Sequence, residues 1–148
     1  MLICIDAGHC LSTPGKRCLK SIDLNETREW VLNSRVANKL EAILAGYSCQ
    51  TMRVDDVTGQ RAVTLSQRVA AANRARADVY LSIHHNAGIN GGSGGGIVAY
   101  VAPSHQKQSE VVRDAVYRYT VVATGLRGNR AQPLAEQSLY VLNYTTMP

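Results

Sequence analysis

Two of the four histidines in this chain, His9 and His84, each follow a short apolar run directly. A single histidine after a strand is more often a hydrogen-bonded structural residue than a ligand, so neither predicts a metal site alone. Together with one carboxylate they would form a His-Glu-His set. Zinc uses such sets in catalytic sites that keep a fourth position for water. Glu26 and Glu29 are both candidates for the carboxylate.

The elements that must position these residues alternate between strand and helix patterns. Strands are predicted at 2–5, 47–54, 78–83, 97–101 and 139–142, and helices from 27 or 28 to 45, at 64–76 and at 104–124. Residues 10–27 are predicted to be a long loop, and 88–96, with six glycines, a mobile one. This order predicts an α/β fold with a mostly parallel central sheet and helices on both faces, in three layers.

A sheet of this kind forms its site at the carboxyl ends of the strands. His9 follows the first predicted strand and His84 ends the third, so both lie at that edge. A carboxylate at the start of the first long helix would face the same edge. Asp6 is predicted to orient His9 or to support its loop, because carboxylates are the usual partners of metal-binding imidazoles. Two histidines at the carboxyl edge therefore favour a metal site, but they do not establish one without a third ligand.

Four segments around these residues resemble, in order, motifs of the zinc-dependent N-acetylmuramoyl-L-alanine amidases that cleave peptidoglycan. The second of them is similar to a loop found in the phage endolysin branch of that family. The segments are Ile5-Asp6-Ala7-Gly8-His9, Thr13-Pro14-Gly15-Lys16-Arg17, Arg28-Glu29-Trp30-Val31-Leu32-Asn33 and Ser82-Ile83-His84-His85-Asn86-Ala87. The resemblance covers nearly the whole chain.

The resemblance also separates the two glutamates. In the family's helix motif the metal-binding Glu precedes an Asn by four positions and an Ala by eight. Glu29 fits this spacing with Asn33 and Ala37, and Glu26 does not. In the last motif the first histidine binds metal and the next position varies. The resemblance thus implies Zn²⁺ as the cofactor, with His9, Glu29 and His84 as its ligands.

The chain departs from the family at two places. Cys10 stands where the family often has glycine, and residues 140–148 resemble the segment just before the family's last core strand. That strand ends in the catalytic Glu, which would lie beyond Pro148. The resemblance therefore implies that residues 1–148 are a single amidase catalytic domain, C-terminally incomplete, that lacks this strand and its general base. Glu136 and Asp6 are the alternative bases within the chain.

The implied reaction is hydrolysis of the amide between N-acetylmuramic acid and L-alanine by zinc-activated water, as in endolysins and autolysins. Two other functions are kept open. One is a zinc peptidase that cuts the stem peptide with similar ligands. The other is a non-catalytic, zinc-containing module that binds peptidoglycan, which the missing Glu favours.

Composition restricts the partners of the chain. Its hydrophobic content of 45% and charged content of 18% are typical of a globular protein. The net charge of +5 is dispersed, without a basic run or an aromatic platform, which argues against nucleic acid. No apolar run is long enough to cross a bilayer. The first residues enter a strand without a basic segment, so we expect no signal peptide, synthesis in the cytoplasm, action on the bacterial wall and a monomer.

Overall fold

The computed structural model describes residues 1–86, 96–104, 106–126, 128 and 134–148. The chain folds as two compact units, one made of residues 1–87 with 147 and the other of residues 88–146 with 148. The predicted mobile loop at 88–96 and His105 lie outside the described residues, apart from Gly96. No described helix is long and apolar enough to span a membrane.

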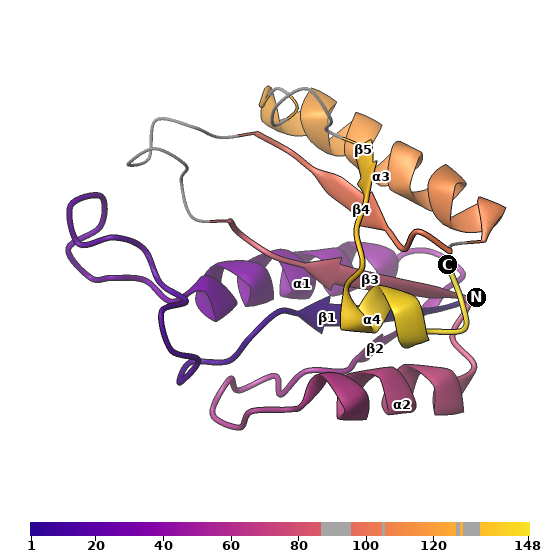
Figure 1. Cartoon of the computed structure of the whole chain (residues 1–148), viewed down its shortest axis with the longest axis horizontal. Coiled ribbons are helices and arrows are strands. Elements are labelled where there is room, and N and C mark those ends of the chain that lie inside the picture. Colours follow the sequence, from indigo (N-terminus) through magenta and orange to yellow (C-terminus); the bar gives the residue numbers. More distant parts are fainter. Residues whose placement is uncertain (87–95, 105, 127, 129–133) are drawn as a thin grey trace. The chain divides into compact units, whose positions relative to one another are not determined.

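The first unit is a parallel sheet with two long helices (Figure 1). Its strands are β1 (Leu2–Ala7), β2 (Gln50–Arg53) and β3 (Val79–Ile83), in the order β2-β1-β3. Its helices are α1 (Glu29–Leu44) and α2 (Leu65–Ala75). Both pairings of β1 are parallel, so all three strands end at the same edge. The predicted α/β class with a mostly parallel sheet is confirmed.

Alternate residues of β1 face different helices. Ile5 and Ala7 are fully buried in one cluster with Trp30 of α1. Asp6, between them in sequence, points to the other face and pairs with Arg68 of α2. A strand with period two that is covered on both faces produces this arrangement. The central strand is therefore positioned by α1 and α2 together.

The start of α2 is stabilised by a capping box. The Thr64 side chain accepts a hydrogen bond from the Gln67 backbone N–H, and the Gln67 side chain accepts one from the Thr64 N–H. Each bond satisfies an N–H group that a helix start leaves without an intrahelical partner. The helix ends at Arg76, whose φ of 51° is left-handed. The boundaries of α2 are thus determined locally.

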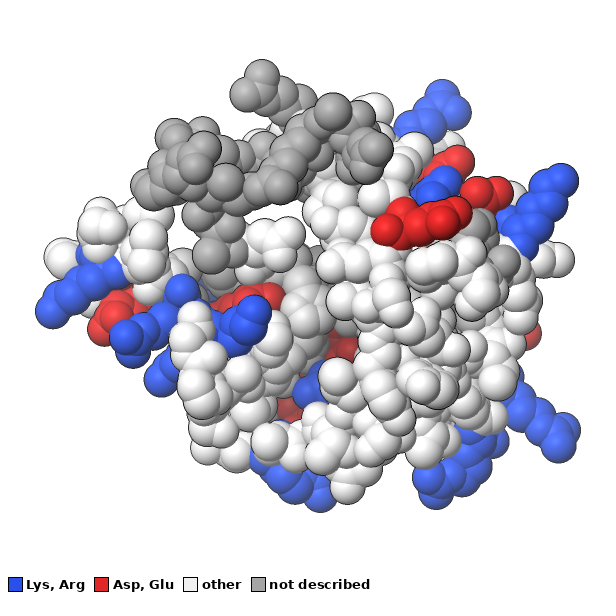
Figure 2. Space-filling view, viewed as in Figure 1, with Lys and Arg blue, Asp and Glu red and all other residues white. Residues whose placement is uncertain are grey.

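The second unit contains a two-stranded sheet and two helices. The strands β4 (Ala99–Val101) and β5 (Leu134–Glu136) are parallel, and α3 (Lys107–Thr124) packs on both. The short helix α4 (Tyr140–Tyr144) follows β5. Lys and Arg side chains occur at several separate places on the face shown in Figure 2, in agreement with the dispersed charge of the sequence.

Two sequence predictions in this unit are wrong. The strand predicted at 139–142 is the helix α4, and β5, on which Glu136 lies, is absent from the predicted strands. A short apolar run has no periodicity that separates a buried strand from one helical turn. Here the turn is closed by hydrogen bonds of Asn143 and Thr145 to Leu139 and Val141. These backbone hydrogen bonds within the segment stabilise a helical turn where a strand was predicted.

The helix α3 begins three residues later than predicted and buries none of its residues. The apolar side chains of Val111 and Tyr119 on this helix are exposed. Helical spacing of apolar residues shows which side chains share a face, and it does not show what covers that face.

Candidate metal centre

The structure brings His9, Glu29 and His84 together at the carboxyl edge of the first sheet. One ligand atom from each lies within 4.8 Å of the others. Glu29 lies between the two histidines, with Oε2 3.3 Å from His9 Nε2 and Oε1 3.0 Å from His84 Nδ1. The imidazole rings meet edge to face, 4.9 Å apart at their centroids. Two imidazoles and a carboxylate at this spacing fit the donor set that zinc prefers.

Glu29 is positioned by the start of α1, of which it is the first residue. Its N–H donates to the Lys16 carbonyl at 3.0 Å, and Trp30 beside it is buried in the core. Glu26 lies in the preceding loop with a left-handed φ of 48°, and its carboxylate pairs with Arg17 at 3.1 Å. Only Glu29 of the two candidate glutamates belongs to the cluster.

His9 has a left-handed backbone with φ of 69°, a conformation that costs free energy for most residues other than glycine. Neighbouring side chains bind the main chain on both sides of this turn. Arg68 donates to the His9 carbonyl at 2.9 Å, and Asn33 donates to the Gly8 carbonyl at 3.0 Å. These bonds fix the direction in which the His9 imidazole leaves the backbone.

Arg68 is buried, and its bonds to three groups support β1 and the turn after it. Besides the His9 carbonyl, it binds the Ala7 carbonyl at 3.0 Å and the Asp6 carboxylate. Asp6 in turn accepts hydrogen bonds from Tyr80 at 2.8 Å and Ser82 at 3.0 Å. Asp6 therefore supports the loop of His9 through Arg68, and in the described part of the chain it does not bind the His9 imidazole directly.

Arg68 is a residue of the site that was not predicted from the sequence. The sequence did contain a signal for it. Arg68 lies four residues after the capping residue Thr64, on the buried side of α2 with Val69 and Ala72. A charged side chain in a buried stripe requires a partner. Because side chains of a strand alternate between its two faces, Asp6 of β1 lies on the face that Arg68 of α2 covers.

Gly8 permits the close approach of His84. A Cβ atom at Gly8 would overlap the His84 imidazole, since its nearest neighbours would all be atoms of that ring. The Gly8 N–H also donates to the Ile83 carbonyl at 3.0 Å, which holds the ends of β1 and β3 together. Only glycine therefore fits between the two histidines without moving one of them.

We expect Gly8→Ala to weaken zinc binding by about tenfold or more, because the added methyl group must displace the His84 ring from Glu29. Competition with a fluorescent chelator measures this change. Gly125→Ala is the control, since Gly125, at the end of α3, has a left-handed φ of 67° and open space around its Cβ position. That control should lose stability and keep its zinc affinity. Wild-type affinity in Gly8→Ala would contradict the assigned contact.

His85 and Asn33 form a second layer around the carboxylate. His85 Nδ1 lies 2.8 Å from Asn33 Oδ1, and the His85 N–H donates to Glu29 Oε1 at 3.3 Å. Asn33 is fully buried and also binds the Gly8 carbonyl. The asparagine four residues after Glu29 thus connects both histidine segments to α1.

Asp55 supports the same edge from the end of β2. Asp55 is buried, with two hydrogen bonds from Arg53 at 2.7 Å each. It also accepts the Trp30 Nε1–H at 3.2 Å and the Ala7 N–H at 3.3 Å. The end of β1 and the first turn of α1 are therefore joined through one carboxylate.

The local electrostatics favour the metal-binding forms of His9 and Glu29. Burial lowers the pKa of His9, and the charges of His84, Lys16 and Arg68 lower it further against the effect of Glu29. Burial acts to raise the pKa of the Glu29 carboxyl, but its hydrogen bond with His84 and the nearby positive charges outweigh burial and lower it. Neutral imidazole and ionised carboxylate are the forms that bind metal.

All four cysteines are free thiols in the structure. Cys10, next to His9, is buried with its Sγ atom 3.4 Å from Ser12 Oγ and 3.3 Å from Thr13 Oγ1. These hydroxyl groups lower the pKa of the Cys10 thiol. Cys10 is not a member of the ligand cluster.

Comparison with known proteins gives one consistent result. Residues 3–148 match the N-acetylmuramoyl-L-alanine amidase family. The chain is 28% identical over 146 residues to the sporulation-specific N-acetylmuramoyl-L-alanine amidase of Bacillus subtilis (strain 168), covering 99% of the chain and 52% of that protein. It is 30% identical over 146 residues to the N-acetylmuramoyl-L-alanine amidase CwlM of Bacillus licheniformis, covering 99% and 53%. The chain thus spans about half the length of these curated relatives.

Solved structures of N-acetylmuramoyl-L-alanine amidases are similar to this chain in fold. The N-acetylmuramoyl-L-alanine amidase from Clostridium difficile 630 superposes with a TM-score of 0.85 at 27% identity, covering 99% of this chain and 75% of that one. The catalytic domain of CwlV from Bacillus (Paenibacillus) polymyxa var. colistinus gives 0.82 at 26% identity with the same coverage. By its sequence match and its fold, the chain belongs to the N-acetylmuramoyl-L-alanine amidase family.

Proposed function

We propose that this protein is a zinc-dependent peptidoglycan amidase that hydrolyses the bond between N-acetylmuramic acid and L-alanine. The observation that carries the proposal is the convergence of His9, Glu29 and His84 in a chain of the amidase family. We further propose that it acts on the bacterial cell wall as a monomer, in the manner of phage endolysins and autolysins.

The residues of the centre fit Zn²⁺ by their chemistry. Zinc held by them would polarise the carbonyl of the muramoyl amide and activate water for attack on it. His9 and Glu29 would hold the ion from the end of β1 and the start of α1, and His84 from the end of β3. Because these supports are packed elements, the ligands keep their orientation while substrate binds.

The reaction also needs a base that takes the proton of the attacking water and gives it to the departing amine. Asp6 is a poor candidate, because it is buried and bound to Arg68, Tyr80 and Ser82. Glu136, the other alternative, lies on β5 in the second unit, whereas the three proposed ligands belong to the first.

We infer that the base belongs to a further segment beyond Pro148, which adds the last core strand of one catalytic domain. Two observations support this. The family match reaches residue 148, where the chain covers 75% of each of two solved amidase structures. In the described part of the chain, β3 pairs only with β1, so its other edge can accept a strand. The proposed base therefore has no residue number within this chain.

We expect the 148-residue chain to bind zinc and to hydrolyse peptidoglycan poorly. A positioned general base contributes about 10²–10⁴-fold to the rate, so a version extended beyond Pro148 through this segment should be faster by that factor. Clearing of cell-wall suspensions, followed by turbidity with both proteins at equal zinc occupancy, measures the difference. Full activity of the shorter chain, confirmed intact by mass spectrometry, would refute this requirement.

The products of the extended version distinguish the proposed function from its two alternatives. An amidase frees the amino group of L-alanine and leaves the glycan strand intact. A zinc peptidase would release new termini within the stem peptide. Zinc and wall binding without any turnover by the extended version would identify a non-catalytic module.

A further inference from the structure

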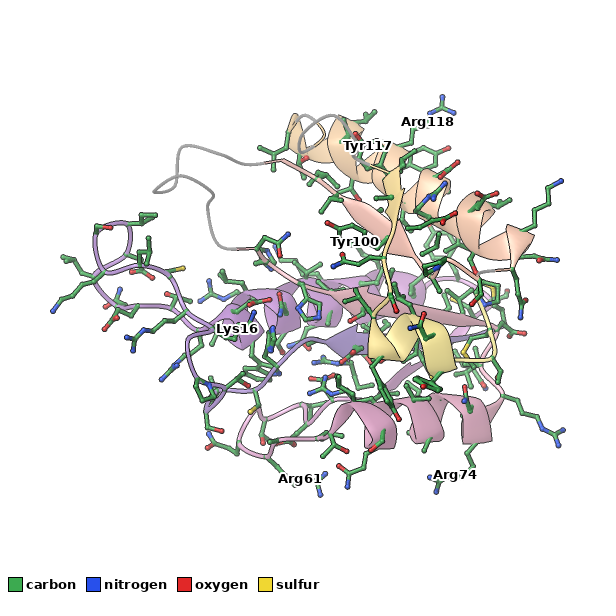
Figure 3. All side chains as sticks on the ribbon, viewed as in Figure 1. Lys16, Arg61, Arg74, Tyr100, Tyr117 and Arg118 are labelled. Atoms are coloured by element: carbon green, nitrogen blue, oxygen red, sulfur yellow. The ribbon has the colours of Figure 1, made fainter. Side chains whose placement is uncertain are left out.

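Lys16 is anchored directly beside the metal centre. Its carbonyl accepts the N–H of Glu29 at 3.0 Å, so its main chain lies against the first turn of α1. The preceding turn is fixed by the left-handed φ of Gly15, 71°, and by a bond from the Lys16 N–H to the Thr13 carbonyl at 3.4 Å. Figure 3 shows Lys16 at the start of α1. The position of this lysine relative to Glu29 is therefore determined by the backbone.

The ammonium group of Lys16 is available to a ligand. The side chain is exposed, and it forms no ion pair with any residue that the structure describes. The acidic groups nearby in the loop have other partners. Glu26 pairs with Arg17, and Asp23 accepts the N–H groups of Asn25 and Thr27 at 3.0 and 2.9 Å. Lys and Arg side chains gather over this loop, between β1 and α1, at the left of Figure 2.

The charge of Lys16 lies close to the proposed ligands, because the main chain of Lys16 contacts the Glu29 N–H at the start of α1. With a divalent cation bound, this charge is not needed to balance Glu29. One carboxylate and two neutral imidazoles leave such a centre with a net charge of about +1, and Lys16 adds to it. The combined field attracts an anionic group of the substrate.

We propose that Lys16 binds the free α-carboxylate of the second residue of the stem peptide, the D-glutamate that follows L-alanine. This inference rests on the proposed function. The amide to be cut is neutral, and this carboxylate is the nearest anionic group on its peptide side. Two residues of extended chain span about 7 Å, a distance that a lysine side chain beside the metal centre can cover. Lys16 would therefore favour stems with a free carboxylate over stems amidated at this position.

The test uses the zinc-loaded chain and two muramoyl peptides that differ only at the second residue, D-glutamate or D-isoglutamine. Calorimetry gives the Kd of each for wild type, for Lys16→Met and for Lys20→Met, which removes the same charge from the same loop. Wild type and Lys20→Met should bind the carboxylate form about fivefold more tightly. Lys16→Met should bind both forms equally, with the affinity that wild type has for the amidated form.

Other outcomes overturn the inference in different ways. If Lys16→Met keeps the preference of wild type, the lysine does not bind this carboxylate. If it weakens both forms equally, Lys16 acts on a group that both share. If wild type binds neither form although it holds zinc, the proposed substrate is wrong and this inference falls with it. Mass spectrometry after each titration checks that the peptides remain intact.

Discussion

Replacement of Glu29 by alanine is expected to weaken zinc binding by more than about 100-fold, whereas Glu26→Ala should leave it nearly unchanged. Glu29 supplies the only carboxylate of the cluster and touches both histidines. Removal even of an outer partner of a metal ligand typically costs about 10–100-fold in affinity, so loss of a ligand should cost more. Glu26 instead pairs with Arg17 in the loop.

Competition with a chelator of known affinity, at fixed pH, measures both variants against wild type. Circular dichroism of each variant shows whether the fold is kept. An equal loss of zinc affinity in the two variants would contradict the assignment of Glu29, and not Glu26, as the metal ligand. Unchanged affinity in Glu29→Ala would remove the carboxylate from the site altogether.

The second large effect is expected at Arg68. Arg68→Met should lower the free energy of unfolding by about 3–5 kcal/mol, because it leaves the Asp6 carboxylate buried without its cation. The same change leaves the carbonyls of Ala7 and His9 without this donor. Urea unfolding of the variant measures the loss, and Arg74→Met, an exposed position on the same helix, is the control.

A double variant tests whether the charge is the cause. Asp6→Asn combined with Arg68→Met removes both charges, so it should recover part of the stability that Arg68→Met loses. A loss in Arg68→Met no larger than that of Arg74→Met would show that the buried pair contributes little. No recovery in the double variant would assign the loss to the carbonyl contacts instead.

Much of the first unit could be predicted from the sequence because its signals are local. The capping box at Thr64 is a four-residue pattern whose bonds form within the same turn. The convergence of His9 and His84 follows from a general property of parallel sheets, in which strand ends share one edge. These features do not depend on knowing which distant side chains meet.

The features that the sequence did not reveal depend on distant contacts or on very short segments. Arg68 and Asp6 are 62 residues apart, and nothing local to either residue identifies the other. The segment around Val141 is too short for its periodicity to distinguish a turn of helix from a strand. The exposure of the apolar side chains of α3 could not be predicted either. Helical spacing of apolar residues does not show which element, if any, covers them.

The three proposed ligands lie just after β1, at the start of α1 and just after β3, all in the first unit. An ion held by them would therefore bind the folded form of that unit and not its unfolded chain. Mass action then adds RT ln(1 + [Zn²⁺]/Kd) to the free energy of unfolding, about 2.7 kcal/mol at a free zinc concentration of about 100 Kd. The second unit contributes none of these ligands, so this gain would belong to the first unit. A higher supply of free zinc would in this way stabilise the folded form of the first unit.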